Sequence, residues 1–467
     1  MAGMQPTNGS PGLARQIGFW SAVAVVVGST IGSGIFRSPA GIAEKVPDPL
    51  AMLLVWAVAG LFVLCGALTM AELGGAYPHA GGLYVILREA YGRMAAFLFG
   101  WAQLVLIRPA AQGAVALVFA EYALRLKGWT PESTEFNRWA TYMAIGAMIV
   151  VASANYRGVR LGAGVQNLTT LAKTGGLLVL VALALVMALP EGTGNFSPAP
   201  TQTGLTFSAF GLALVSVLWA YDGWADVSYV GGEVVDARRN VPRAILTGTA
   251  IIIGVYLLAN VAYLAVFSTT EIATSQQVAA DVMQRLIGAP GLVFIVATVM
   301  ISTFGTLNGS LLTAPRIFYA MAEDKLFFRP VARVHPRFRT PHVSIVLTAI
   351  LSVVFVSIGR FESLTDTFVI ALVPFYGLSV GAVFVLRSRQ ARRSRDGEVG
   401  GRLEYDPPVR TPLYPLVPLV FIASTVILLA NSLWDATSRL PTQITLAAVL
   451  VGAPVYFLTV GRRRGRA

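Results

Sequence analysis

The chain has 467 residues and a net charge of +12; 55% of its residues are hydrophobic and only 12% are charged. Soluble globular proteins average about 25% charged residues, so this composition excludes an ordinary soluble domain. Apolar runs of about 20 residues, long enough to span a bilayer, recur from end to end and predict an all-α polytopic membrane protein. The single cysteine, Cys65, lies in an apolar run and rules out an internal disulfide.

Hydropathy predicts about twelve transmembrane helices. They fall near residues 18–46, 49–76, 95–126, 139–155, 163–189, 205–232, 243–268, 290–321, 343–359, 363–386, 413–432 and 442–460. We therefore expect a cytoplasmic N-terminal segment at 1–17, five helices in 18–189, five in 205–386, a basic cytoplasmic linker at 387–412, two helices in 413–460 and a cytoplasmic tail at 461–467.

Positive charges decide the expected orientation. Lys and Arg residues gather in alternate connections, most densely at 387–395 and 462–466. By the positive-inside rule both termini lie in the cytoplasm, so we expect a multi-pass protein of the cell (inner) membrane, in contact with the lipid bilayer. The same placement argues against nucleic acid as a partner. The segment at 387–412 also has the composition of an anionic-lipid site, but a topology signal is the simpler interpretation.

The first predicted helix contains VGSTIGSGIFRS at residues 27–38, in which Gly28, Gly32 and Gly34 lie close together. Each glycine lowers helix propensity by about 1 kcal/mol relative to alanine, and irregular backbone at membrane depth is tolerated where it lines a cavity or is buried in protein. We therefore predict a broken helix whose second half begins near Gly34. Its first N–H groups carry positive dipole character and suit a carboxylate. The alternative is that the glycines let helices pack closely.

The sixth predicted helix contains SVLWAYDGWAD at residues 216–226, where aspartate next to glycine between aromatic residues makes a poor continuous membrane helix. The first interruption lies in helix one and the second lies five helices later. Paired interruptions at corresponding places in two halves indicate an inverted-repeat transporter. Helices one to five and six to ten would form the repeats, with helices eleven and twelve appended.

Charges inside the predicted helices are costly and mark candidate functional groups. Lys173 lies in the middle of helix five, where its ammonium can stand in for a metal cation and hold carbonyls of a broken helix; a purely structural salt bridge is the alternative. Asp222 and Asp226 lie at the second break and would line the pathway, cap the half-helix or face water. Three further charges are expected to be interfacial or paired: Arg37, Glu72 and Arg108.

No cofactor, metal site or enzyme activity is predicted. The three histidines, His79, His335 and His342, fall in predicted loops without metal-ligand spacing around them. No nucleophile elbow or phosphate loop stands out either.

Four stretches resemble a known family. They are VGSTIGSGIFRSP at 27–39, AELGGAYPHAGGLY at 71–84, WAYDGW at 219–224 with the loop that follows at 232–245, and FGTLNGSLLTAPR at 304–316. In this order they resemble the amino acid–polyamine–organocation superfamily, and more closely a bacterial stand-alone member of the L-type amino acid transporter family. The resemblance covers most of residues 18–330.

The resemblance implies a leucine-transporter-type fold with a 5+5 inverted repeat, broken helices one and six, and alternating access to a free L-amino acid. The substrate carboxylate would meet N–H groups at Ser33 and Gly34, and the amino group would meet backbone carbonyls at both breaks. The implied substrate-binding residues are Thr30, Ile31, Gly32, Ser33, Gly34, Trp219, Ala220 and Asp222, with Trp219 as the gate. Lys173 would replace a sodium ion and contact the Gly28 carbonyl and Ser302 or Thr303.

Some positions depart from the family pattern. The loop after helix six has Asp236 and Ala237 where Asn-Pro is usual, and 323–325 read Glu-Asp-Lys in place of Glu-Gly-His. These changes put gate details in doubt. Residues 127–138 contain no cysteine, so no disulfide-linked heavy subunit is expected.

The leading functional hypothesis is secondary active, sodium-independent exchange of neutral L-amino acids across the plasma membrane. A proton symporter in which Lys173 gives up its proton is one alternative. A cationic amino acid or polyamine antiporter is another, if Asp222 or Asp226 faces the side-chain pocket. A non-transporting amino acid sensor is a remote alternative.

Overall fold

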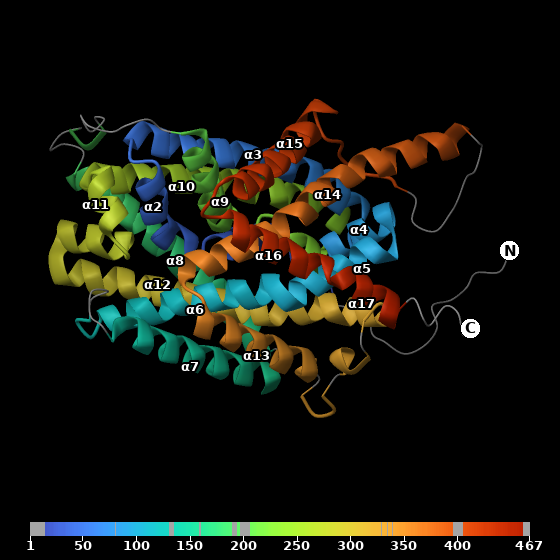
Figure 1. The fold of residues 1–467 in the computed structure, drawn as a ribbon, viewed down its shortest axis with the longest axis horizontal. Helices are drawn as coiled ribbons and strands as arrows, with labels where there is room; N and C mark the ends of the chain where they lie inside the picture. Colours follow the sequence, from blue (N-terminus) through green and yellow to red (C-terminus); the bar gives the residue numbers. More distant parts are fainter. Residues whose placement is uncertain are drawn as a thin grey trace.

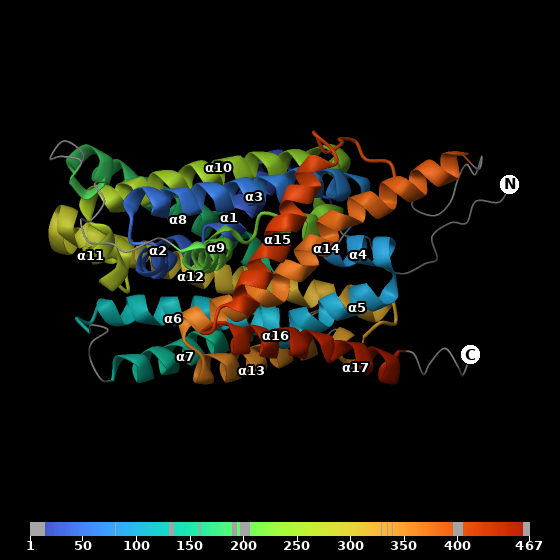
Figure 2. The ribbon, with the colours of Figure 1, turned by 45° about the horizontal axis from the view of Figure 1, so that its top comes forward.

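The computed structural model is a bundle of helices (Figures 1 and 2). It describes residues 15–79, 81–129, 135–157, 160–188, 194–196, 206–327, 329–333, 335–338, 340–395 and 405–460. In these ranges the only extended pairing is a single parallel bridge between Ile17 and Val234. The predicted all-α class is therefore confirmed.

The elements follow one another in this order: α1 (Phe19–Thr30), α2 (Gly34–Lys45), α3 (Pro49–Ala76), α4 (Leu83–Tyr91), α5 (Arg93–Ala102), the π-helix η1 (Gln103–Ile107), α6 (Arg108–Arg125), α7 (Phe136–Arg157), α8 (Arg160–Met187), the 3-10 helix η3 (Gly194–Phe196), α9 (Phe207–Tyr221), the 3-10 helix η4 (Asp226–Glu233), α10 (Ala237–Val266), α11 (Thr269–Thr274), α12 (Val278–Glu323), the 3-10 helix η5 (Arg329–Ala332), α13 (His342–Ile358), α14 (Phe361–Arg395), α15 (Leu416–Trp434), α16 (Arg439–Leu450) and α17 (Gly452–Thr459).

A helix occupies each of the twelve predicted positions. In the described part of the chain nine spans are long and apolar enough to cross a bilayer, and the bent pair α1 and α2 makes a tenth. The other two positions hold α7, with 22 residues, and the shorter apolar helix α13, with 17. Many large apolar side chains, such as Leu413, Phe207 and Trp434, are exposed on the outside, which suits a surface covered by lipid. The chain is a polytopic membrane protein.

Two helices differ from their predicted ends. α12 begins at Val278, well before residue 290, because a short preceding helix joins it across a kink at Ile287 and Gly288. α14 continues to Arg395, so the expected linker at 387–412 begins with more than two helical turns. No glycine or proline interrupts the chain between Gly381 and Arg395, and arginine is a good helix former, which explains the extension.

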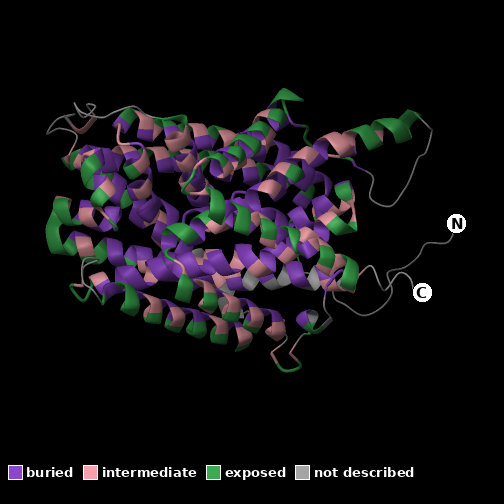
Figure 3. Cartoon of the chain, viewed as in Figure 1, coloured by how far each residue is buried: buried purple, intermediate pink, exposed green. Residues whose placement is uncertain are grey.

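The broken helices lie inside the bundle. α3 and α10 run side by side along one face in both views, and α6, α7 and α13 lie on the opposite side (Figures 1 and 2). α1 packs on α10 and α8, α2 packs on α9, and α14 contacts α6, α9 and α15. Buried residues fill this interior, while exposed residues lie on the outer helices (Figure 3). The two breaks are thus shielded from the surroundings by neighbouring helices.

Candidate functional site

The first break separates α1 from α2. α1 ends at Thr30, α2 begins at Gly34 as predicted, and the two axes differ by 42°. Pro39 lies inside α2 and has no N–H, so the carbonyl of Ile35 lacks its usual helical partner. The hydroxyl of Tyr263 in α10 donates to that carbonyl at 3.2 Å. The second half-helix is therefore held by a side chain from a neighbouring helix.

The second break follows α9. Tyr221 ends the helix, Asp222 is extended, and Gly223 has a φ of +110°, which favours glycine. A Cβ atom at Gly223 would lie 2.7 Å from the carbonyl carbon of Ser29, so glycine also permits the two breaks to touch. Gly34, at the first break, also permits this close approach, since a Cβ atom there would lie 2.7 Å from the Cβ of Ala220.

One tyrosine joins the two breaks. The hydroxyl of Tyr256 in α10 lies 2.7 Å from the Thr30 carbonyl oxygen and 3.0 Å from the Ala220 carbonyl oxygen. A hydroxyl has a single proton, so it donates to one carbonyl at a time. Sequence reasoning missed this residue, because it lies in an uninterrupted apolar helix. The available signal was a tyrosine hydroxyl at mid-membrane depth, which needs a partner.

A cavity of about 260 Å³ lies against both breaks, between them and α6, α12 and α14. Six of the predicted substrate-binding residues line it: Thr30, Gly32, Ser33, Gly34, Trp219 and Asp222. The other two, Ile31 and Ala220, are buried beside it and do not line it. The Ser33 hydroxyl and the Trp219 indole N–H are buried and have no hydrogen-bond partner among the described residues. Buried polar groups are normally paired, so these two groups suit a ligand.

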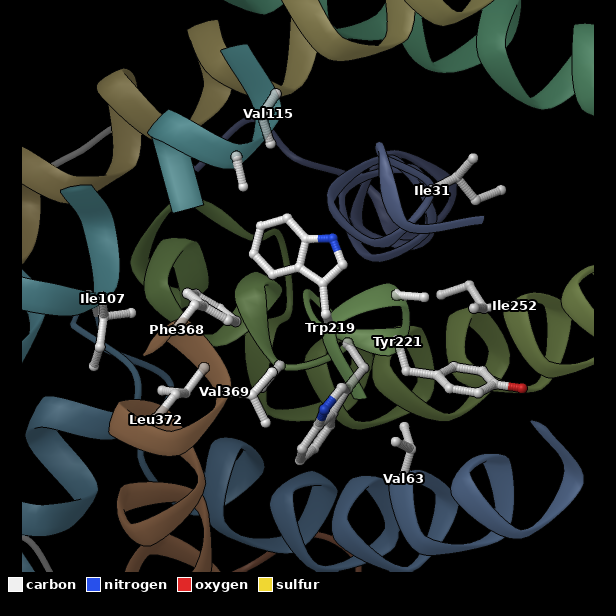
Figure 4. Close-up of a cluster of buried hydrophobic side chains, with 14 of the residues drawn as sticks. Ile31, Val63, Ile107, Val115, Trp219, Tyr221, Ile252, Phe368, Val369 and Leu372 are labelled. Atoms are coloured by element: carbon white, nitrogen blue, oxygen red, sulfur yellow. The ribbon is translucent and has the colours of Figure 1, made fainter. Parts of the chain in front are cut away.

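Trp219 lines the cavity, and its ring lies between Ile31, Val115 and Phe368 (Figure 4). Its ring meets Phe368 edge-on at 4.9 Å and Phe361 edge-on at 6.2 Å between centroids. Phe361 is not part of the cavity lining. The aromatic rings therefore close the cavity on this side.

A charged layer lies beyond these rings. The guanidinium of Arg37 lies 5.4 Å from the centre of the Phe361 ring. It forms ion pairs with Glu362 of α14 at 2.9 Å and with Glu121 of α6 at 3.5 Å. In the other direction the cavity extends to Ile17 and Glu233, beside the bridge that follows the N-terminal segment.

Lys173 of α8 is fully buried, and its Nζ donates to the carbonyl of Gly28, the partner expected from the sequence. Its second partner is the Thr306 hydroxyl at 3.4 Å. The structure does not bring Ser302 or Thr303 to the ammonium. The Thr303 hydroxyl bonds carbonyls of its own helix, and the Ser302 hydroxyl has no partner among the described residues. Lys173 thus joins α1 to α12, although one helical turn from the predicted contact.

The remaining predicted charges divide between the cavity and its surroundings. Arg108, Asp222 and Asp226 all line the cavity. Arg37 and Glu72 lie outside it and are paired. The Glu72 carboxylate, fully buried in α3, accepts hydrogen bonds from Arg387, Tyr405 and Thr411. Among the described residues no three His, Cys, Asp or Glu side chains form a metal site.

The fold defines a polytopic membrane protein with a cavity of small-molecule size against two helix breaks. The profile of the family described as amino acid permease matches residues 17–455, and the chain belongs to that family. It is 32% identical to the serine/threonine exchanger SteT of Bacillus subtilis over 96% of this chain and 97% of that protein. It is 30% identical to the human b(0,+)-type amino acid transporter 1, over 97% of this chain and 89% of the relative. It is 31% identical to the human large neutral amino acids transporter small subunit 2, over 97% of this chain and 82% of that relative.

Proposed function

We propose that this protein is a secondary active transporter that exchanges neutral L-amino acids without sodium, by alternating access. The observation that carries the proposal is the cavity at the two breaks, a space of amino acid size whose lining includes residues of both breaks. Two of these lining residues, Ser33 and Trp219, keep a buried hydroxyl and a buried indole N–H without a partner among the described residues. Membership of the amino acid permease family supports the substrate class. Similarity to a serine/threonine exchanger supports exchange as the mode of transport.

In this proposal the breaks bind the backbone of the substrate. The carboxylate meets the first N–H groups of α2 at Ser33 and Gly34, with the Ser33 hydroxyl beside it, because the N-terminus of a helix attracts anions. The amino group meets carbonyls at Thr30, Ile31 and the end of α9. Tyr256 holds two of these carbonyls, and each carbonyl oxygen has a second lone pair for the ammonium.

The proposal places the structure in an inward-facing state. If both termini lie in the cytoplasm, the end of the cavity at Ile17 and Glu233 is the cytoplasmic end. The rings around Trp219 and the ion pairs of Arg37 then form the closed outer side. The two breaks, five helices apart, fit the 5+5 inverted repeat, with alternating access as the relative movement of the repeats. The cell membrane is the proposed location.

Lys173 is proposed as a fixed cation in place of sodium. Its ammonium contacts α1 at the Gly28 carbonyl, and therefore holds the broken helix without a coupling ion. A second candidate, proton symport, is favoured by one observation. Among the described residues the ammonium contacts neutral oxygens of Gly28 and Thr306 and no carboxylate, so no ion pair keeps its proton in place.

Proteoliposomes distinguish these functions. Purified protein is reconstituted in vesicles that contain unlabelled L-serine or no amino acid, and uptake of labelled L-serine is followed in sodium-free buffer, with and without an acid-outside gradient. Exchange predicts uptake only into loaded vesicles, independent of the gradient. Uptake into empty vesicles that requires the gradient would establish the symporter. No uptake in either condition, with intact binding of L-serine, would contradict transport and favour a sensor.

A further inference from the structure

The cavity wall carries charges that binding of a substrate's carboxylate and amino groups leaves unused. Four charged residues line the cavity: Arg108 of α6, Asp222 and Asp226 at the second break, and Glu233 at the far end. Arg108, Asp222 and Asp226 lie close enough to act on one another electrostatically. A side chain of the substrate that extends along the cavity therefore meets these groups.

Asp222 is already engaged by the protein. Its Oδ1 accepts a hydrogen bond of 2.7 Å from the Tyr376 hydroxyl of α14. It also lines a second, smaller cavity between α9, α14 and α15. Donors on a carboxylate compensate its negative charge locally.

Arg108 and Asp226 are less fully used. Arg108 donates from Nε to the Gln103 side chain at 3.0 Å, and its two Nη groups have no partner among the described residues. The Ser29 side chain lies beside the Asp226 carboxylate. Within the part of the chain that the structure describes, no ion pair joins Arg108 to either aspartate. One cation on α6 and one anion on η4 thus border the same space and remain apart.

We propose that Arg108 and Asp226 form a side-chain subsite that favours substrates with an uncharged side chain carrying both a hydrogen-bond acceptor and a donor, above all the amide of glutamine. This inference rests on the proposed function and adds the substrate class. An amide oxygen accepts from the guanidinium, and an amide nitrogen donates to the carboxylate.

The other side-chain classes fit this subsite poorly. The positive charge of Arg108 repels a cationic side chain, and the negative charge of Asp226 repels an anionic one. An apolar side chain removes water from both charges and replaces none of its hydrogen bonds.

Competition for L-serine exchange tests the subsite. Wild-type protein is reconstituted as above, and glutamine, methionine, lysine and glutamate, four side chains of similar length, compete with labelled L-serine. We expect glutamine to compete at a concentration about tenfold below that of the other three, since a hydrogen-bonding site discriminates strongly against analogues that leave it unpaired. A wild-type preference for methionine or lysine over glutamine overturns the inference, whether or not any variant folds.

Two variants give opposite expectations. Asp226→Asn leaves the positive charge of Arg108 without the nearby negative charge, so glutamate should compete with L-serine more strongly relative to lysine than it does in the wild type. Arg108→Gln leaves the negative charge of Asp226 without the nearby positive charge, so lysine should compete more strongly relative to glutamate. Both variants could instead slow exchange without changing the relative strength of competition by the four amino acids. The pair would then act on the conformational cycle, and the inference would be wrong. Absence of exchange by the wild type with labelled L-serine and with labelled L-glutamine would instead remove the proposed function itself.

Discussion

The hydroxyl of Tyr256 lies 2.7 Å from the carbonyl oxygen of Thr30, at the point where the first transmembrane helix stops. Its distance to the Ala220 carbonyl at the end of α9 is 3.0 Å. Two backbone carbonyls from different breaks thus share one donor on α10. This arrangement satisfies groups that the membrane interior would otherwise leave unpaired, and it fixes the relative position of the two breaks.

Removing this hydroxyl should impair transport. Tyr256→Phe leaves both carbonyls without the donor at a cost of about 1–3 kcal/mol, the usual penalty for an unsatisfied buried group. We expect the half-saturation concentration for L-serine to rise and the exchange rate to fall about tenfold. Tyr221→Phe is the matched control, because Tyr221 packs against Tyr256 but its hydroxyl donates to the Trp56 carbonyl of α3 and to no carbonyl of either break. Equal behaviour of the two variants would show that the link between the breaks is not needed.

Lys173 gives the second prediction. Lys173→Met keeps the length of the side chain and removes the donor from the Gly28 carbonyl and the Thr306 hydroxyl. At about 1–3 kcal/mol for the lost donor, exchange should fall between roughly fivefold and a hundredfold. Lys127→Met, at an exposed lysine, is the control. Full exchange by Lys173→Met would exclude the lysine from the mechanism. Thr306→Val should also reduce exchange, more than Thr303→Val does.

The contrast between Thr306 and Thr303 illustrates what a sequence can predict. Glycines in an apolar run are a local signal, so the break before Gly34 was placed correctly. The partner of Lys173 depends on how far α12 is shifted along α8, and no local pattern specifies that shift. The same holds for Tyr256, which reads as one more residue of an apolar helix until the neighbouring breaks are in place.

Contacts between distant segments are harder still. Glu72 and Tyr405 are 333 residues apart in the chain and share a hydrogen bond. From the sequence, Glu72 is expected only to be interfacial or paired, and its three partners all lie in the segment at 387–412, for which the sequence predicts a basic cytoplasmic linker. The spacing of Arg108 and Asp226 in the sequence also does not show that they border one cavity, because only the packing of α6 against the second break brings them to the same space.

The ion pairs of Arg37 should control access from the closed side. Its side chain is only 9% exposed, and Arg37→Gln leaves the buried Glu121 without its cation. Breaking a buried pair in this way costs about 3–5 kcal/mol, enough to shift the balance between two conformations. Ala111 of α6 lines the cavity. We expect a cysteine introduced there as Ala111→Cys, in a Cys65→Ala background, to become accessible to a thiol reagent from the side of Glu362.

A matched control for this shift is Arg125→Gln. Arg125 is the last residue of α6 and pairs with Asp281 of α12 at 2.7 Å; among the described residues its hydrogen bonds go to α12 and none goes to α2. Labelling from the Glu362 side should therefore stay low in this variant. If Arg37→Gln and Arg125→Gln label alike, the Arg37 ion pairs do not hold the outer side closed.

The buried carboxylate of Glu72 should hold the segment that follows α14. Its Oε2 accepts from the Thr411 backbone N–H and hydroxyl, both at 2.7 Å, and from Arg387 at 2.6 Å. Glu72→Gln replaces one accepting oxygen by an NH₂ group, which faces donors of the protein in place of an acceptor. The loss of the buried charge pair costs about 3 kcal/mol of stability. Trypsin cleavage after the exposed Arg410 should then become at least about tenfold faster, as measured by fragment mass, because local opening next to Thr411 becomes more frequent.

Asp406→Asn is the control. It breaks only the exposed pair with Arg238, worth about 0–1 kcal/mol, and should leave the cleavage rate nearly unchanged. Equal rates in both variants would mean that Glu72 does not anchor this segment.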